Sequence, residues 1–371
     1  MAIPFIDLKT QQKRIRTSID QRLAKLLEHG SYIMGPEVGE LEKTLAAYVG
    51  VKHCVSCSSG TDALLMPLMT YGIGAGDVVF TSPFTFIATA EVVALLHAKT
   101  AFVDINERTY NIDPSKLDDA VKKYAANPSL GKMRGIIPVD LFGQTADYDA
   151  IQTIATKYGL WVMEDAAQAF GATYKGKKSC SFGNVGATSF FPAKPLGCYG
   201  DGGAIFCNDD EMHKALVSIR VHGQGEDKYN NVRVGINGRI DTMQAAILLA
   251  KMEIFDEEIG LRNQVADRYS KALQSKYVTP FVAKDCVSVW AQYSILAENR
   301  AEAMGKLKAN NIPSAVYYPK PLHLQDAFRD LGGKKGDFPI SERIAEKIFS
   351  LPMHPYLTTD DQTMIVNALM Q

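Results

Sequence analysis

Short apolar runs alternate with stretches of helical spacing between about residues 78 and 165 of this 371-residue chain. The runs lie at 78–82, 101–105, 135–140 and 160–165, and a helical pattern follows each of the first three. Such alternation is typical of a parallel α/β sheet, because parallel strands need long crossover connections that are usually helices. We therefore expect a mostly parallel central sheet flanked by helices, with ligands bound beyond the carboxyl ends of its strands.

The pattern changes after about residue 244, where a long helical stretch leads into a mixed region. We expect a large domain over 1–255, which begins with a helical segment, and a smaller α+β domain over 256–371. A helix is also expected to begin at Pro36. In the N-terminal segment, five apolar residues are expected on one face of a helix: Ile15, Ile19, Leu23, Leu26 and Leu27.

Charge and composition exclude several classes of partner. Forty basic residues against 41 acidic ones give a net charge of −1, so the field needed for non-specific binding to nucleic acid or an anionic membrane is missing. The apolar runs are too short to span a bilayer, and the first residues lack the apolar region of a signal peptide, which favours a cytoplasmic protein. The six cysteines are expected to be buried thiols, and His222 has no second histidine at ligand spacing, so no metal site is expected.

Two acidic residues end the fourth apolar run. Glu164 and Asp165 follow LWVM, which would place Asp165 at the carboxyl edge of a strand. One interpretation is an aspartate that caps the next helix. The other is a carboxylate that keeps a cationic ring nitrogen protonated, and Gln168 would then reach the same ligand.

A lysine between two prolines stands in the stretch SFFPAKPLG (189–197). Because Pro195 follows Lys194 directly, the backbone of the lysine is biased away from helix. Phe190 and Phe191 would partly desolvate the amine and lower its pKa, as a lysine that forms a Schiff base requires. The alternative is a surface lysine in a loop.

Other residues have the properties needed to bind a phosphate group and to stack on a flat ring. Gly60 and Thr61 lie where a loop enters a helix, an arrangement that binds anions through free backbone amides, although a plain helix cap fits as well. Ser189 would add a hydroxyl, and Phe86 would stack on a ring or pack in the core. The glycines of GDGGAIF (200–206) lack the dinucleotide-binding pattern and are expected to form tight turns.

In their order and spacing these features match a pyridoxal-phosphate enzyme, and the chain resembles the DegT/DnrJ/EryC1/StrS family of nucleotide-sugar aminotransferases over nearly its whole length. The stretches that carry this resemblance are FIDLKTQ, GSYIMGPEV, SSGTDAL, FTFIATAE, EDAAQAFGA, TSFFPAKPLG, GDGGAIF and GINGRIDTMQAAILLAK. The resemblance implies a fold-type-I homodimer with shared active sites and pyridoxal 5′-phosphate as cofactor. Glutamate would donate the amino group to a nucleotide-linked keto sugar.

The resemblance also implies roles for single residues. Lys194 would form the Schiff base with the cofactor, Asp165 would pair with the ring nitrogen, and Gln168 would reach the ring hydroxyl. The remaining cofactor contacts would come from Gly60, Thr61 and Ser189 at the phosphate, Phe86 over the ring, and Asn237 of the other subunit at the phosphate.

Within the family, the chain most resembles transaminases that act at C3 of UDP-2-acetamido-2-deoxy-3-oxo-glucuronate in polysaccharide (O-antigen) biosynthesis. This resemblance implies that Gly30, Tyr32, Arg239, Tyr317 and Tyr318 contact the substrate. The chain departs from that group at Ala193, where serine is usual, and at Tyr317, where histidine is usual.

Other functions stay open. Two lie within the family: transfer to C4 of a UDP-4-keto-6-deoxy sugar, or to C3 of a dTDP-3-keto-6-deoxy sugar. Lys194 argues against the family's dehydratases, which lack this lysine, and the missing glycine fingerprint argues against a nicotinamide dehydrogenase. A non-catalytic sugar-binding or regulatory homologue would keep the fold without turnover.

Overall fold

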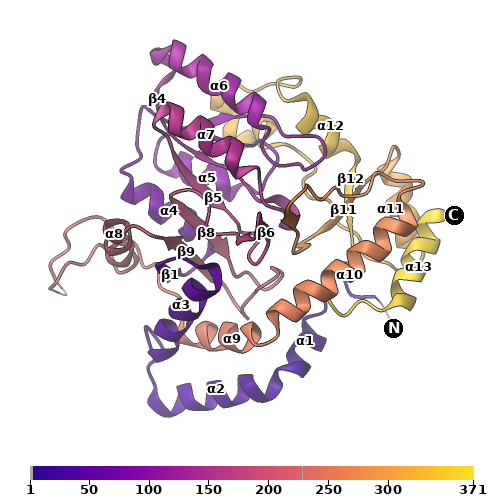
Figure 1. Ribbon diagram of the computed structural model, residues 1–371, viewed down its shortest axis with the longest axis horizontal. Helices are drawn as coiled ribbons and strands as arrows, with labels where there is room; N and C mark the ends of the chain where they lie inside the picture. Colours follow the sequence, from indigo (N-terminus) through magenta and orange to yellow (C-terminus); the bar gives the residue numbers. More distant parts are fainter. Residues whose placement is uncertain (1–2, 228) are drawn as a thin grey trace.

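A seven-stranded sheet forms the centre of the molecule (Figure 1). The computed structural model describes residues 3–227 and 229–371. In spatial order the strands are β1 (His53–Cys57), β9 (Gly203–Cys207), β8 (Val185–Ser189), β5 (Trp161–Asp165), β4 (Lys132–Ile137), β2 (Asp77–Thr81) and β3 (Lys99–Phe102). Only β9 runs antiparallel to its neighbours in this sheet, so the expected mostly parallel sheet is confirmed.

Helices cover both faces of the sheet. The helices of the large region are α1 (Leu8–Arg14), α2 (Arg16–His29), α3 (Pro36–Val49), α4 (Gly60–Thr70), α5 (Ala88–Leu95), α6 (Pro114–Ala126), α7 (Tyr148–Tyr158), α8 (Asp210–Arg220) and α9 (Thr242–Met252). Successive residues of β9 point to opposite faces: Ile205 packs in the core beneath α4 and α8, and Phe206 packs in the core beneath α3 and α9. The expected helix start at Pro36 is confirmed.

The apolar face expected near the N-terminus is correct at four of its five positions. Ile15, Ile19 and Leu26 are buried, and Leu23 packs against the same small core. The prediction for Leu27 was wrong, since its side chain is 63% exposed. One residue advances about 100° around a helix, so Leu27 turns away once Leu26 faces inward.

The C-terminal region packs beside this layered body. Its elements are α10 (Phe255–Leu273), β10 (Cys286–Val287), β11 (Tyr293–Leu296), α11 (Arg300–Ala309), α12 (Pro339–Lys347), β12 (Ile348–Leu351) and α13 (Thr359–Met370), together with short 3-10 helices at Leu322–Leu324 and Asp326–Leu331. Two further strands, β6 (Thr173–Tyr174) and β7 (Lys177–Lys178), form a small sheet with β10. Strands β11 and β12 pair antiparallel.

Helix α10 connects the two regions (Figure 1). Phe255 at its start packs in the core of the large region, whereas Val265 and Tyr269 pack in the core of the C-terminal region. The expected domain boundary at 255 therefore falls at the start of this connecting helix. Across the described residues, no helix combines the length and apolarity needed to cross a membrane.

Candidate active site

Asp165 lies at the carboxyl end of β5, where the sequence placed it. Its side chain is buried, and Thr89 in the first turn of α5 donates a hydrogen bond of 2.8 Å to its Oδ2. The backbone N–H of Ala167 donates to Oδ1 at 3.2 Å. Burial raises the pKa of Asp165, and the hydrogen bond from Thr89 and the charge of Lys194 oppose that shift.

Lys194 faces Asp165 from the loop that follows β8. Its backbone N–H donates to Phe191 O at 2.9 Å, which closes a turn and keeps the residue out of a helix. Burial lowers the pKa of the Lys194 amine to about 8, although the charge of Asp165 acts in the opposite direction. A pKa near 8 leaves a far larger share of neutral, nucleophilic amine at neutral pH than an exposed lysine has.

The loop before α4 and the end of β8 form a close-packed cradle. A Cβ on Gly60 would lie 2.5 Å from Ser189 Cβ, so only glycine lets the two segments approach this closely. Ser59 caps α4 by accepting a hydrogen bond of 3.0 Å from Asp62 N–H. The first amides of α4, at Gly60 and Thr61, therefore lie beside the Ser189 hydroxyl, as anion binding requires.

The expectation that the glycines of 200–206 form turns was wrong for Gly203, which is the first residue of β9. A Cβ at Gly203 would lie 2.3 Å from Ser59 O. This glycine is therefore needed for close approach of β9 to the loop before α4.

Gln168 and Tyr318 meet close to Asp165, whose charge acts on Tyr318. The Gln168 amide donates to the Tyr318 hydroxyl at 2.9 Å and accepts from the backbone N–H of Phe142 at 2.8 Å. The ring centroids of Phe86 and Tyr318 are 6.4 Å apart, and Phe86 is 56% exposed. Phe86 therefore presents a ring face that is open to a ligand and does not serve the core.

Asn237 and Arg239 belong to a second group of residues. Arg239 Nε donates to Asn237 Oδ1 at 2.9 Å, and both residues line a cavity of about 340 Å³ together with Ile33, Ser58 and Asp201. Ser58 N–H donates to Gly238 O at 3.0 Å, so this cavity adjoins the loop before α4.

The segment of Gly30 and Tyr32 is joined to this second group. Gly30 ends α2 in a left-handed conformation, and Tyr32 O accepts from Thr242 N–H at 3.0 Å. Tyr317, by contrast, lies beside Tyr318 in the first group. The predicted residues thus fall into two groups within one chain.

Comparison with known proteins agrees with the family that the sequence indicated. The family model of the DegT/DnrJ/EryC1/StrS aminotransferases matches residues 13–370. The chain belongs to this family.

Individual relatives match along their whole length. The chain is 52% identical to the UDP-2-acetamido-2-deoxy-3-oxo-D-glucuronate aminotransferase of Pseudomonas aeruginosa, over 99% of both chains. It is 42% identical to a pleiotropic regulatory protein of Geobacillus stearothermophilus, over 100% of this chain and 98% of the relative. The crystal structure of a DegT/DnrJ/EryC1/StrS aminotransferase from Brucella abortus superposes with a TM-score of 0.97 at 48% identity, covering 99% and 98% of the two chains. The expected fold and enzyme class are confirmed.

The cofactor of the family is pyridoxal 5′-phosphate, and the residues present fit it. The cradle at Gly60 has no room for a side chain and exposes helix-terminal amides, as a phosphate group requires. Asp165 is a buried carboxylate, which favours a cationic partner such as a protonated ring nitrogen. Lys194 supplies an amine whose lowered pKa suits reaction with a carbonyl.

Two features of this DegT/DnrJ/EryC1/StrS site were not expected from the sequence. The first is Thr89, although it stands three residues after Phe86 in the quoted stretch FTFIATAE. The second is a pair of buried carboxyls, Asp140 and Glu164, at the end of β5: Glu164 precedes Asp165 in the chain, and Asp140 N–H donates to Asp165 O at 3.0 Å. Burial raises the pKa of both carboxyls, which favours their neutral forms close to Asp165.

Proposed function

We propose that the enzyme transfers an amino group from glutamate to C3 of UDP-2-acetamido-2-deoxy-3-oxo-glucuronate. The observation that carries the transfer chemistry is the placement of the half-buried Lys194 amine close enough to the buried Asp165 carboxylate for their charges to interact. The identity of 52% to the Pseudomonas aeruginosa enzyme, over nearly all of both chains, supports this keto sugar above the others.

Each residue of the pair has a separate task. When bound, pyridoxal phosphate supplies an electron sink for the negative charge that develops at the carbon next to the transferred amine. Asp165 would keep the ring nitrogen protonated, and Thr89 orients the Asp165 carboxylate. Lys194 Nζ would hold the cofactor and would accept the proton from the α-carbon of the amino donor. Gln168, which is hydrogen-bonded to Phe142 and Tyr318, would hold the ring through its hydroxyl.

The second group of residues would complete the site in a homodimer. Asn237 of one subunit would reach the cofactor phosphate of the other, and Arg239 would bind a carboxylate or phosphate of the substrate through its planar fork. Exposed apolar residues beside this cavity, Ile33, Met34 and Met243, support an interface there. Gly30, Tyr32, Tyr317 and Tyr318 would contact the sugar nucleotide.

The location of the enzyme follows from its proposed substrate. Nucleotide sugars and glutamate are charged metabolites of the cytoplasm, so we propose that the protein acts there. Its product would serve the synthesis of a surface polysaccharide such as a lipopolysaccharide O-antigen.

A panel of keto sugars tests the proposal. The purified enzyme is incubated with glutamate and either the 3-oxo-glucuronate, a UDP-4-keto-6-deoxy sugar or a dTDP-3-keto-6-deoxy sugar, and mass spectrometry identifies the aminated product. We expect amination of the uronate with the highest kcat/KM. A higher kcat/KM with another sugar would show that the proposed substrate is wrong. If the enzyme aminates none of the three sugars, a regulatory role is favoured, as the name of the Geobacillus stearothermophilus relative suggests.

A further inference from the structure

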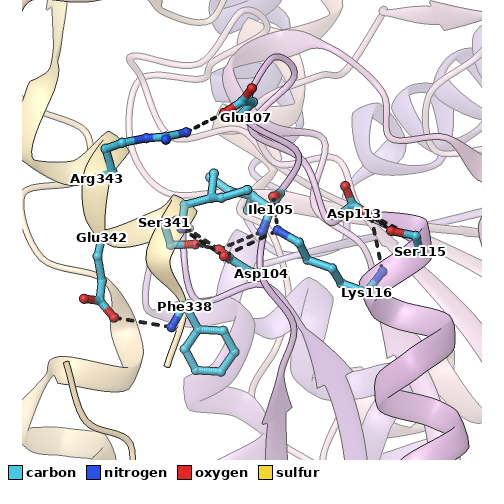
Figure 2. A network of polar contacts seen from close by, with 11 residues as sticks. Asp104, Ile105, Glu107, Asp113, Ser115, Lys116, Phe338, Ser341, Glu342 and Arg343 are labelled. Atoms are coloured by element: carbon cyan, nitrogen blue, oxygen red, sulfur yellow. Dashed lines mark hydrogen bonds and ion pairs between the residues drawn. The ribbon is translucent and has the colours of Figure 1, made fainter. Parts of the chain in front are cut away.

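Asp104 connects the large region to a helix of the C-terminal region (Figure 2). It follows β3 by two residues, and its side chain is 6% exposed. Oδ1 accepts hydrogen bonds from Ser341 N–H at 2.9 Å and from the Ser341 hydroxyl at 2.6 Å. Oδ2 accepts from Ile340 N–H at 3.0 Å, and Lys116 Nζ lies 3.5 Å away.

These contacts make Asp104 the cap of α12. The first amides of a helix have no partner within the helix, and Phe338 at the N-cap position offers no side-chain acceptor. A carboxylate from a distant part of the chain takes that place and also complements the helix dipole. The neighbouring ion pair of Glu107 with Arg343 is exposed, so it holds the helix less firmly.

Helix α12 is joined to the tyrosines of the site by a short path. It leads directly into β12, where Ser350 N–H donates to Ala315 O at 2.7 Å and Ala315 N–H donates to Ser350 O at 3.2 Å. Ala315 stands two residues before Tyr317. Ile344 of α12 belongs to the apolar cluster against which Tyr317 and Tyr318 pack.

We propose that Asp104 is a positioning residue for substrate binding, because it holds α12 and through it the Tyr317–Tyr318 segment against Gln168. The inference rests on the proposed function for the role of the two tyrosines. Most of the proposed cofactor contacts lie on or beside β5, β8 and α4, and the Tyr317–Tyr318 segment meets them only at Gln168 and Phe86. Loss of the cap should therefore weaken binding of the keto sugar more than binding of the cofactor.

The test compares Asp104→Ala with Asp209→Ala. Asp209 is a matched control because it also caps a helix, accepting from Met212 N–H at 2.7 Å, but its helix is α8 of the large region. Asp104→Asn and Ser341→Ala are milder variants that test the same cap if Asp104→Ala does not fold. All proteins are studied as holoenzymes, well below their melting temperatures.

Two measurements are made on each variant: hydrogen exchange at Ile340, Ser341 and Ala315, and steady-state kinetics with the keto sugar. For Asp104→Ala we expect exchange at all three amides to be at least about tenfold faster. We expect KM for the sugar to rise about tenfold, with the visible spectrum and the cofactor Kd within about twofold of the wild type. Asp209→Ala should change neither Ala315 exchange nor the sugar KM.

The outcomes separate this inference from the proposed function. A lower Tm in the Asp104 variants with unchanged Ala315 exchange and unchanged KM would show a purely structural role and overturn the inference. Faster exchange with an unchanged KM would overturn the link to substrate binding. If the wild type aminates no keto sugar, the proposed function fails, and exchange at Ala315 still decides whether Asp104 positions the tyrosine segment.

Discussion

Thr89 donates a hydrogen bond of 2.8 Å to the buried carboxylate of Asp165. This bond favours the ionised form of Asp165 and opposes the rise in pKa that burial causes. A neutral Asp165 could not keep a ring nitrogen protonated. The hydroxyl of Thr89 therefore helps maintain the charge on which the site depends.

Replacing Thr89 by valine should raise the pKa of Asp165 further. The carboxyl group then takes up its proton at a higher pH, so the acidic limb of the kcat/KM profile and the pH-dependent visible spectrum of the holoenzyme should both shift upward. We expect kcat to fall roughly tenfold at neutral pH. Thr188→Val is the control, because the buried Thr188 hydroxyl donates to Ala166 O and not to Asp165. An unchanged pH profile in Thr89→Val would contradict this role.

Lys194 and Lys251 offer a direct comparison of two lysines whose pKa is lowered by their surroundings. Burial lowers the pKa of each to about 8, but only Lys194 faces Asp165. Borohydride reduction of the holoenzyme should attach the cofactor to the peptide that carries Lys194 and leave the Lys251 peptide unlabelled, as peptide mass spectrometry would show. Lys194→Ala should lower kcat by roughly 10²–10⁴-fold. Full turnover in that variant, or label on Lys251, would refute the assignment.

Gly60→Ala should weaken cofactor binding. The new Cβ would lie 2.5 Å from Ser189 Cβ, so the loop before α4 must move and its amides lose their alignment. We expect the Kd of pyridoxal phosphate to rise at least about tenfold, measured by titration of the apoenzyme. Gly39→Ala is the control, since a Cβ at that position of α3 meets no atom within 4 Å. Equal affinities in the two variants would argue against the cradle.

His354 should make the protein less stable in acid. Burial lowers its pKa to about 4, below the value of about 6.5 in an unfolded chain. Between these values the unfolded state binds a proton that the folded state does not, so stability falls as pH drops from about 6.5 to 4. The loss reaches about 3 kcal/mol at pH 4. Urea denaturation from pH 7 to 4.5 should show a shallower pH slope for His354→Gln, and an equal slope would count against this account.

The sequence by itself determined the layered α/β fold and much of the site. Strand β5 ends at Asp165 and α3 begins at Pro36, because apolar runs, prolines and acidic residues at strand ends are local signals. Lys194 stood out for the same reason, since its neighbours along the chain already indicated a turn with apolar surroundings. The order of these signals was enough to predict the family and its cofactor.

Only the tertiary structure decided how distant segments meet. The antiparallel direction of β9, the need for glycine at position 203 and the outward turn of Leu27 depend on neighbours that are remote in sequence. The same holds for Asp104, which caps a helix more than 230 residues further along, and for Tyr318, which meets Gln168 150 residues away. Periodicity reports which face of an element is apolar, but the partner of that face is set by the packing of the whole chain.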